Sequence, residues 1–151
     1  AHCRFSEPHP KGVRLATLQA ANEQSTNDRS CNLILEHAGA TIPLMGDPSD
    51  AVEKNLIAQT PANVDFLLVS HHGAESSSSA AWLNHVKPDI AVISAGINNP
   101  FGHPSAGALK RLTDRGARVL ATSTAGALHV WFDPDQQAHL SIKSARDNRT
   151  P

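Results

Sequence analysis

Aromatic residues, long apolar runs and an excess of one charge are all missing from this chain of 151 residues. Aromatic residues make up only 4% and tyrosine is absent, so the core has to be built mainly from alanine, valine, leucine and isoleucine. The longest apolar stretches, such as residues 90–93, are far too short to span a bilayer, and no charged-then-apolar leader opens the chain. A formal net charge of −1 gives no global electrostatic case for nucleic-acid binding.

The remaining composition is that of one soluble globular domain. Apolar residues make up 40% and charged residues 18%, and the length suffices for one substantial core. Four cations lie close together in the sequence and leave a local basic face open, although a solvated helix face explains them better. They are Lys110, Arg111, Arg115 and Arg118.

The two cysteines, Cys3 and Cys31, have neither Cys-x-x-Cys nor zinc-finger spacing. In an oxidising compartment they would pair and close a loop of moderate length, whereas two buried free thiols are the equal alternative. Because the chain does not begin with methionine, we expect an excised or processed segment of a longer parent.

What the chain does have is a regular succession of strand and helix patterns. Period-two or short apolar runs predict strands at residues 13–18, 31–37, 41–45, 64–69, 90–94, 118–121, 127–132 and 138–142. Helical spacing predicts helices at residues 50–59, 78–86 and 104–115. The order is a hairpin, three alternating helix–strand units and a closing hairpin, which predicts an α/β layered sheet. We expect one domain with its core over about residues 12–143 and a flexible tail over 144–151.

Histidine is abundant, at nine of 151 residues, and three polar clusters directly follow predicted strands. They contain Asp47 after Gly46, the pair His71 and His72, and His103 before a proline. Ligand sites of open α/β sheets lie beyond the carboxyl ends of the strands, so we expect these clusters at one sheet edge. One carboxylate with two or three imidazoles forms a site that suits Zn²⁺, Mn²⁺ or Fe.

Each cluster also has a structural explanation. Asp47 in a Gly-Asp-Pro turn fits an Asx-turn or a helix cap, and His103 fits the turn at a helix N-terminus. Two adjacent imidazoles after a buried strand lose hydration and need a partner, which favours a functional role for His71 and His72. Residues 76–79, all serine, offer hydroxyls and N–H groups to a phosphate, but plain helix capping explains them better.

Six short motifs occur in a defined order: NDRSC at 27–31, LMGD at 44–47, VSHHG at 69–73 followed by SSS at 76–78, AVISAG at 91–96, NPFGHP at 99–104 and TAGA at 124–127. Together they resemble the metallo-β-lactamase-like C-terminal domain of the ComEC/Rec2 DNA-uptake (competence) family. The resemblance covers about residues 12–132. It implies the C-terminal half of an αββα sandwich with metals at the sheet edge.

The resemblance implies roles for the four site residues. Asp47 matches a carboxylate that bridges two metals, His103 matches a metal ligand, and His71 and His72 match an element with ligand or proton-shuttle roles. The implied cofactor is Zn²⁺ or Mn²⁺, two ions per complete site. The implied activity is metal-dependent phosphodiester hydrolysis of single-stranded DNA, by a domain on the extracytoplasmic side of an inner-membrane-associated parent, with a cytoplasmic domain as the alternative.

The family's principal metal motif, His-x-His-x-Asp-His, does not occur in this sequence. About half of the ligands would therefore come from a missing N-terminal half of the domain or from another chain. Two alternatives stay open, namely a catalytically degenerate binding or scaffold domain and a soluble metallo-hydrolase with a small-molecule substrate. From half a sandwich we also expect one exposed apolar sheet face and homo-oligomerisation.

Overall fold

A computed structural model describes residues 10–20, 25–132 and 140–146 of the chain. Its centre is a six-stranded mixed sheet in which the strands follow one another in sequence order. The first three strands pair antiparallel, and each later strand joins the sheet in parallel. The strands are β1 (Val13–Leu18), β2 (Asn32–His37), β3 (Ala40–Leu44), β4 (Phe66–Leu68), β5 (Ile90–Ile93) and β6 (Arg118–Ala121).

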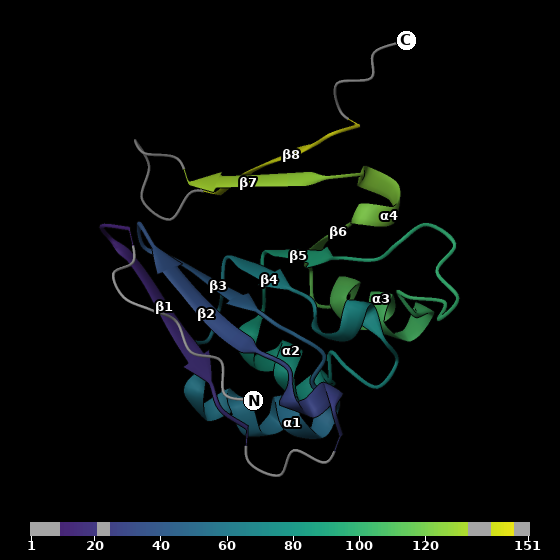
Figure 1. Cartoon of the computed structure of the whole chain (residues 1–151), viewed down its shortest axis with the longest axis horizontal. Helices are drawn as coiled ribbons and strands as arrows, with labels where there is room; N and C mark the ends of the chain where they lie inside the picture. The colour runs from purple at the N-terminus through teal and green to yellow at the C-terminus, as the bar shows by residue number, and fades with distance from the viewer. Residues whose placement is uncertain (1–9, 21–24, 133–139, 147–151) are drawn as a thin grey trace.

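Helices connect the parallel strands, as such crossovers require. They are α1 (Asp50–Leu56), continued by a 3₁₀ turn at Ile57–Gln59, then α2 (Ala80–Val86) and α3 (Ala106–Thr113). All three helices lie on one face of the sheet (Figure 1). A short helix, α4 (Thr122–Ala125), leads into a two-stranded sheet of β7 (Leu128–Phe132) and β8 (Leu140–Ser144). This hairpin lies over the opposite face (Figure 1).

Two apolar clusters hold these layers together. The larger lies between the sheet and the helices, where Leu56, Trp82 and Leu83 are fully buried. The smaller lies under the hairpin and joins Ile42, Phe66 and Val92 of the sheet to residues of β7 and β8. Because alternate strand residues point to opposite faces, β4 contributes Leu67 to the first cluster and Phe66 to the second. The layers therefore run helices, six-stranded sheet, two-stranded sheet.

The predicted α/β class is confirmed, and so is the predicted order of elements. Several element bounds differ by a few residues, and three differences matter for the fold. β4 is only three residues long, α4 was not predicted, and Pro104 lies outside α3. Helix α3 instead begins after Ser105, whose hydroxyl accepts a hydrogen bond from the Ala108 N–H at 3.1 Å.

The predicted exposed apolar sheet face is wrong for the part of the chain that the structure describes. The β7–β8 hairpin covers that face, and Leu44, Leu68 and Leu120 pack against the smaller cluster as half-buried residues. The exposed large apolar residues lie elsewhere, at Ile97, Phe101, Val130 and Trp131. The homo-oligomer that was inferred from this face loses that support and stays a prediction.

β8 runs to Ser144, and residues 147–151 of the predicted tail lie outside the described residues. None of the helices among the described residues is long and apolar enough to cross a membrane.

Candidate functional site

The loops that follow β3, β4 and β5 bring the four predicted site residues together at one edge of the sheet. His72 Nε2 lies 3.8 Å from Asp47 Oδ1. The ring of His71 lies 6.5 Å from that of His72 and 5.7 Å from that of His103, measured between centroids. The expected convergence of the three clusters is therefore present, while the chemical role of each residue stays a prediction.

The His71–His72 pair stands in an unusual backbone conformation. Both residues have positive φ, 48° and 54°, inside the 3₁₀ turn Ser70–Gly73. This left-handed region is uncommon for residues other than glycine and costs about 1–3 kcal/mol for each residue. The His71 N–H donates to the Gly46 carbonyl at 2.8 Å, which ties the turn to the loop carrying Asp47. Such strain is typical of sites where side-chain direction matters more than local stability.

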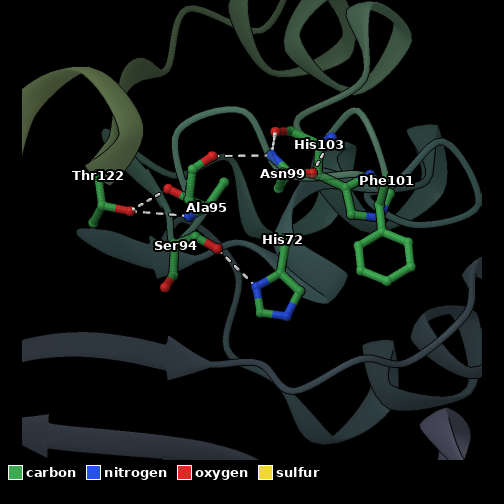
Figure 2. A pocket seen from close by; sticks show the side chains of 8 residues that line it. His72, Ser94, Ala95, Asn99, Phe101, His103 and Thr122 are labelled. Atoms are coloured by element: carbon green, nitrogen blue, oxygen red, sulfur yellow. Dashed lines mark hydrogen bonds between the residues drawn. The ribbon is translucent and has the colours of Figure 1, made fainter.

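His72 is oriented by a backbone carbonyl. Its Nδ1 lies 2.7 Å from the Ser94 carbonyl oxygen (Figure 2). Because a carbonyl only accepts, Nδ1 carries the proton and donates it. That leaves Nε2 directed toward Asp47 Oδ1 at 3.8 Å, a distance too long for a hydrogen bond but suited to an ion pair when the imidazole is protonated.

His103 is held through its backbone by Asn99. The side-chain oxygen Oδ1 of Asn99 accepts from the His103 N–H at 2.9 Å, and Asn99 Nδ2 donates to the His103 carbonyl at 2.6 Å. Burial of the ring lowers the pKa of His103, and the nearby imidazoles of His71 and His72 lower it further, while Asp47 partly opposes them. The buried His103 Nδ1 has no hydrogen-bond partner among the described residues. A neutral imidazole with one unpaired buried nitrogen is ready to meet a ligand.

Residues of the segment that precedes β2 form hydrogen bonds to the site residues. Asn27 Nδ2 donates to His71 Nε2 at 3.2 Å, and the Ser30 hydroxyl accepts from the Asp47 N–H at 2.7 Å. Asp28 is buried, and its carboxylate accepts from the Ser49 N–H at 3.0 Å. The sequence marked residues 27–31 only as part of a resemblance, and these positioning contacts had no local signal.

Gly46 makes this support possible. A Cβ at this position would lie 2.5 Å from the Ser30 Oγ and 2.8 Å from the Cys31 carbonyl oxygen. The Gly46 N–H donates to Asn32 Oδ1 at 3.0 Å. The absence of a side chain therefore lets the Asp47 loop pack directly on the Ser30 segment.

The serine run has a structural role. The N–H groups of Ser78 and Ser79 donate to the two carboxylate oxygens of Glu53 at 2.7 and 2.8 Å, and the Ser79 hydroxyl caps α2. Glu53 is fully buried, and burial raises its pKa against the effect of these hydrogen bonds. The capping interpretation is confirmed for Ser79. The N–H groups of Ser78 and Ser79 serve Glu53 rather than a phosphate.

Several of the cations that left a local basic face open contact other parts of the fold. Arg111 donates to the carbonyls of Glu75, Ser77 and Ser78 and to the Glu75 carboxylate. Arg115 donates to Asn84 Oδ1, and Lys110 pairs with Asp114. The Arg111 contacts fix the loop before α2 on helix α3, which gives this cation a structural role.

A pocket of about 420 Å³ opens beside His72 and His103. Figure 2 shows Ser94, Ala95 and Thr122 on one side of His72, with Phe101 and His103 on the other. Gly96 and Asn99 complete the lining. Phe101 and Thr122 were not predicted as site residues, because an isolated aromatic residue or threonine carries no sequence pattern.

The described residues do not by themselves make a metal site. Among them, no group of three or more His, Cys, Asp or Glu side chains is placed to hold an ion. Asp47 faces His72, while His71 and His103 face each other. The zinc or manganese ion expected at Asp47, His71 and His103 stays a prediction, and binding it would require ligands beyond these described residues.

Cys31 is disulfide-bonded. The other cysteine of the sequence, Cys3, lies outside the described residues.

Comparison with known proteins gives three relatives, and no protein-family profile matches the chain. Recombination protein 2 of Haemophilus influenzae is 31% identical over 145 residues, which cover 95% of this chain and 18% of that protein. Competence protein ComA of Neisseria gonorrhoeae is 31% identical over 84% of the chain and 19% of its own length. ComE operon protein 3 of Bacillus subtilis is 32% identical over 76% of the chain and 15% of its own length. The chain thus spans less than a fifth of each of these proteins.

Proposed function

Because this chain belongs to the ComEC/Rec2 family of competence proteins, we propose that it serves DNA uptake as part of a phosphodiester-cleaving domain. In this proposal the chain supplies Asp47, His71, His72 and His103 to one side of the active site. The motif resemblance and the relatives agree on the family. The activity itself is the step that we add.

The observation that carries the proposal is the unpaired, buried Nδ1 of His103 beside His71. A buried nitrogen without a partner costs about 1–3 kcal/mol and persists where a ligand or ion satisfies it. The strained His71–His72 turn and the dedicated Asn27 contact to His71 point the same way. Four polar side chains from three loops are arranged here at a cost that packing alone does not explain.

The residues of this chain divide into two groups by their contacts. His72 donates through Nδ1 to Ser94 and presents Nε2 to Asp47, a geometry that suits a general acid–base role beside a reacting group. His71 Nε2 accepts a hydrogen bond from Asn27. The Nδ1 of the neutral His103 imidazole, in contrast, has no partner among the described residues. Zinc or manganese suits these ligands, and in this proposal residues beyond those described complete the set.

The layer order supports the C-terminal half of a metallo-β-lactamase-like αββα sandwich. Helices α1, α2 and α3 cover one face of the six-stranded sheet, and the β7–β8 hairpin forms a second sheet over the other (Figure 1). This gives one helix layer and two sheet layers. The second helix layer and the remaining ligands would come from another part of the same domain or from another chain.

The disulfide at Cys31 supports an extracytoplasmic position for this domain in a membrane-associated parent. Disulfides persist in oxidising compartments and are rare in the cytosol.

The test is cleavage of single-stranded DNA by a full-length competence protein that contains this segment. Asp47→Asn should abolish manganese- or zinc-dependent cleavage and lower transformation frequency by orders of magnitude. The matched control is Asp50→Asn, because this exposed carboxylate on α1 makes only a surface pair with Lys54. Unchanged cleavage in a folded Asp47→Asn protein would remove the proposed activity.

The isolated 151-residue chain gives a second arm. We expect little or no cleavage and at most weak metal binding by calorimetry, because the residues that the structure describes include no complete ligand set. Robust cleavage by the isolated chain that Asp47→Ala abolishes would show a complete site within it.

A non-catalytic scaffold domain is the second candidate, and the incomplete ligand set among the described residues favours it. It predicts that transformation survives Asp47→Asn and is lost only when a substitution unfolds the domain.

A further inference from the structure

The pocket beside the site has a property that the four site residues do not explain. Phe101 stands at its wall with 78% of its surface exposed, although large apolar side chains are ordinarily withdrawn from water. Its ring stacks on His103 with centroids 5.9 Å apart and planes 19° apart. His103 in turn neighbours His71 at 5.7 Å. A row of three rings therefore leads from the exposed rim of the pocket to the edge that carries Asp47.

Most of the polar groups that line the pocket are already engaged within the protein, whereas His103 Nδ1 has no partner among the described residues. The Thr122 hydroxyl accepts from the Ala95 N–H and donates to the Ala95 carbonyl, both at 2.9 Å. The Asn99 side chain bonds Gly96 and His103, and the Ser94 carbonyl accepts from His72 (Figure 2). The wall is thus fixed in advance and offers few free groups that could read the edge of a ligand.

The pocket also lacks cationic side chains of the kind that bind phosphates. None of its lining residues is lysine or arginine. A ligand would therefore be held by shape and by contact with the exposed aromatic ring rather than by charge. A flat, uncharged aromatic group fits this description, and a volume of about 420 Å³ is within the range of small-molecule sites.

We propose that this pocket, lined by Phe101, His103, His72 and Thr122 and called here the Phe101 pocket, binds one unpaired nucleobase of a single DNA strand by stacking on Phe101. The proposal rests on the proposed function and names its substrate class. A base within a duplex is covered on both faces and along its pairing edge, so it cannot reach Phe101 without leaving the helix. Stacking tolerates every base, because each one has a π-face. The pocket therefore selects single strands over duplexes without selecting sequence.

The experiment is an NMR titration of the ¹⁵N-labelled 151-residue chain with an oligothymidylate of about ten nucleotides, a length within single-strand site sizes. We expect shifts in the amide signals of residues 94–103 and weaker binding of a duplex of equal length. Phe101→Ala should weaken binding at least about fivefold, and Phe101→Tyr should restore it to within about twofold. The matched control is Trp131→Ala, which removes another exposed aromatic residue, on β7, and should leave binding unchanged.

An abasic oligomer of the same length separates bases from phosphates. It should bind much more weakly, and the affinity for oligothymidylate should depend little on salt, because no lysine or arginine lines the pocket. The proposal is overturned by equal binding of the abasic oligomer, by unchanged affinity in Phe101→Ala, or by the absence of shifts in residues 94–103.

The two proposals fail separately. If Phe101→Ala weakens oligothymidylate binding but Asp47→Asn leaves cleavage unchanged, the proposed function is wrong and the base-binding pocket stands. If Asp47→Asn abolishes cleavage but Phe101→Ala leaves binding unchanged, the base-binding pocket is wrong and the proposed function stands.

Discussion

Asp28 links the stability of this domain to the geometry of its site. The side chain is 5% exposed and accepts hydrogen bonds from the backbone N–H of Ser49 at 3.0 Å and of Ser25 at 3.1 Å. It lies between Asn27, which contacts His71, and the segment around Ser30, which holds the Asp47 N–H. Replacing it with asparagine removes the charge and turns one acceptor oxygen into a donor that faces an N–H group.

The size of the effect follows from the pKa of this carboxyl. Burial alone would raise it, but the hydrogen bonds from Ser49 and Ser25 outweigh burial and lower the pKa of Asp28 from 3.8 to about 2. At about 1.36 kcal/mol per pKa unit, this preference for the ionised form corresponds to about 2 kcal/mol of folding free energy at neutral pH. Because the pKa is lowered in the folded state, this stability is fully present above about pH 4 and is lost as the pH falls toward 2.

The assay is urea unfolding of the wild-type chain and Asp28→Asn from pH 7 down to pH 2. We expect the free energy of unfolding of the variant to be about 2 kcal/mol lower at pH 7. In a thermal unfolding experiment at the same pH, this corresponds to a melting temperature lower by about 4–8 °C. The difference should shrink below pH 4 as the wild-type carboxyl becomes protonated. Asp50→Asn is the control, since an exposed carboxylate of this kind contributes less than about 1 kcal/mol. A constant difference between wild type and Asp28→Asn across the pH range, or none at pH 7, would refute the reasoning.

Two further predictions concern the site directly. Gly46→Ala should lower the free energy of unfolding in urea by about 2 kcal/mol and shift the Asp47 amide signal, because the new Cβ would meet Ser30 and the Cys31 carbonyl. The control Gly96→Ala should be nearly neutral, because no atom lies within 4 Å of a Cβ at that position. Equal stability of the two variants would argue against close packing at Gly46. The ring proton signals of His103 should titrate below pH 6.5, because burial and the neighbouring imidazoles disfavour its protonation, and a midpoint at or above 6.5 would contradict the assignment of a neutral imidazole.

The sequence predicted the order of elements because each carries a strong periodic signal. Strands β1 and β6 were predicted at the residues where they occur. Helix α4, Thr122–Ala125, was missed, because its polar and β-branched residues favour no helix locally. Its first residue is fixed instead by the hydrogen bonds of Thr122 to Ala95, 27 residues away in sequence.

The site likewise has features that the local sequence encodes and features that depend on distant contacts. Asp47, His71, His72 and His103 were predicted to converge because polar residues after parallel strands meet at one sheet edge. Their supports were not, since the contact of Asn27 with His71 spans 44 residues and no local pattern encodes it. The exposed Phe101 was also missed, because the exposure of a side chain is set by tertiary packing and not by the local sequence.

The way in which the site is assembled also limits when it can exist. His72 depends on Ser94, 22 residues later, and Asp47 depends on Ser30, 17 residues earlier, so these bonds form only once distant segments have met. The parallel pairings β3–β4 and β4–β5 that bring those loops together are long-range contacts of the kind that form late in folding. A chain that has collapsed but not yet paired these strands would hold every one of these side chains and none of their geometry. Any chemistry at this edge would therefore begin only once the native fold has formed.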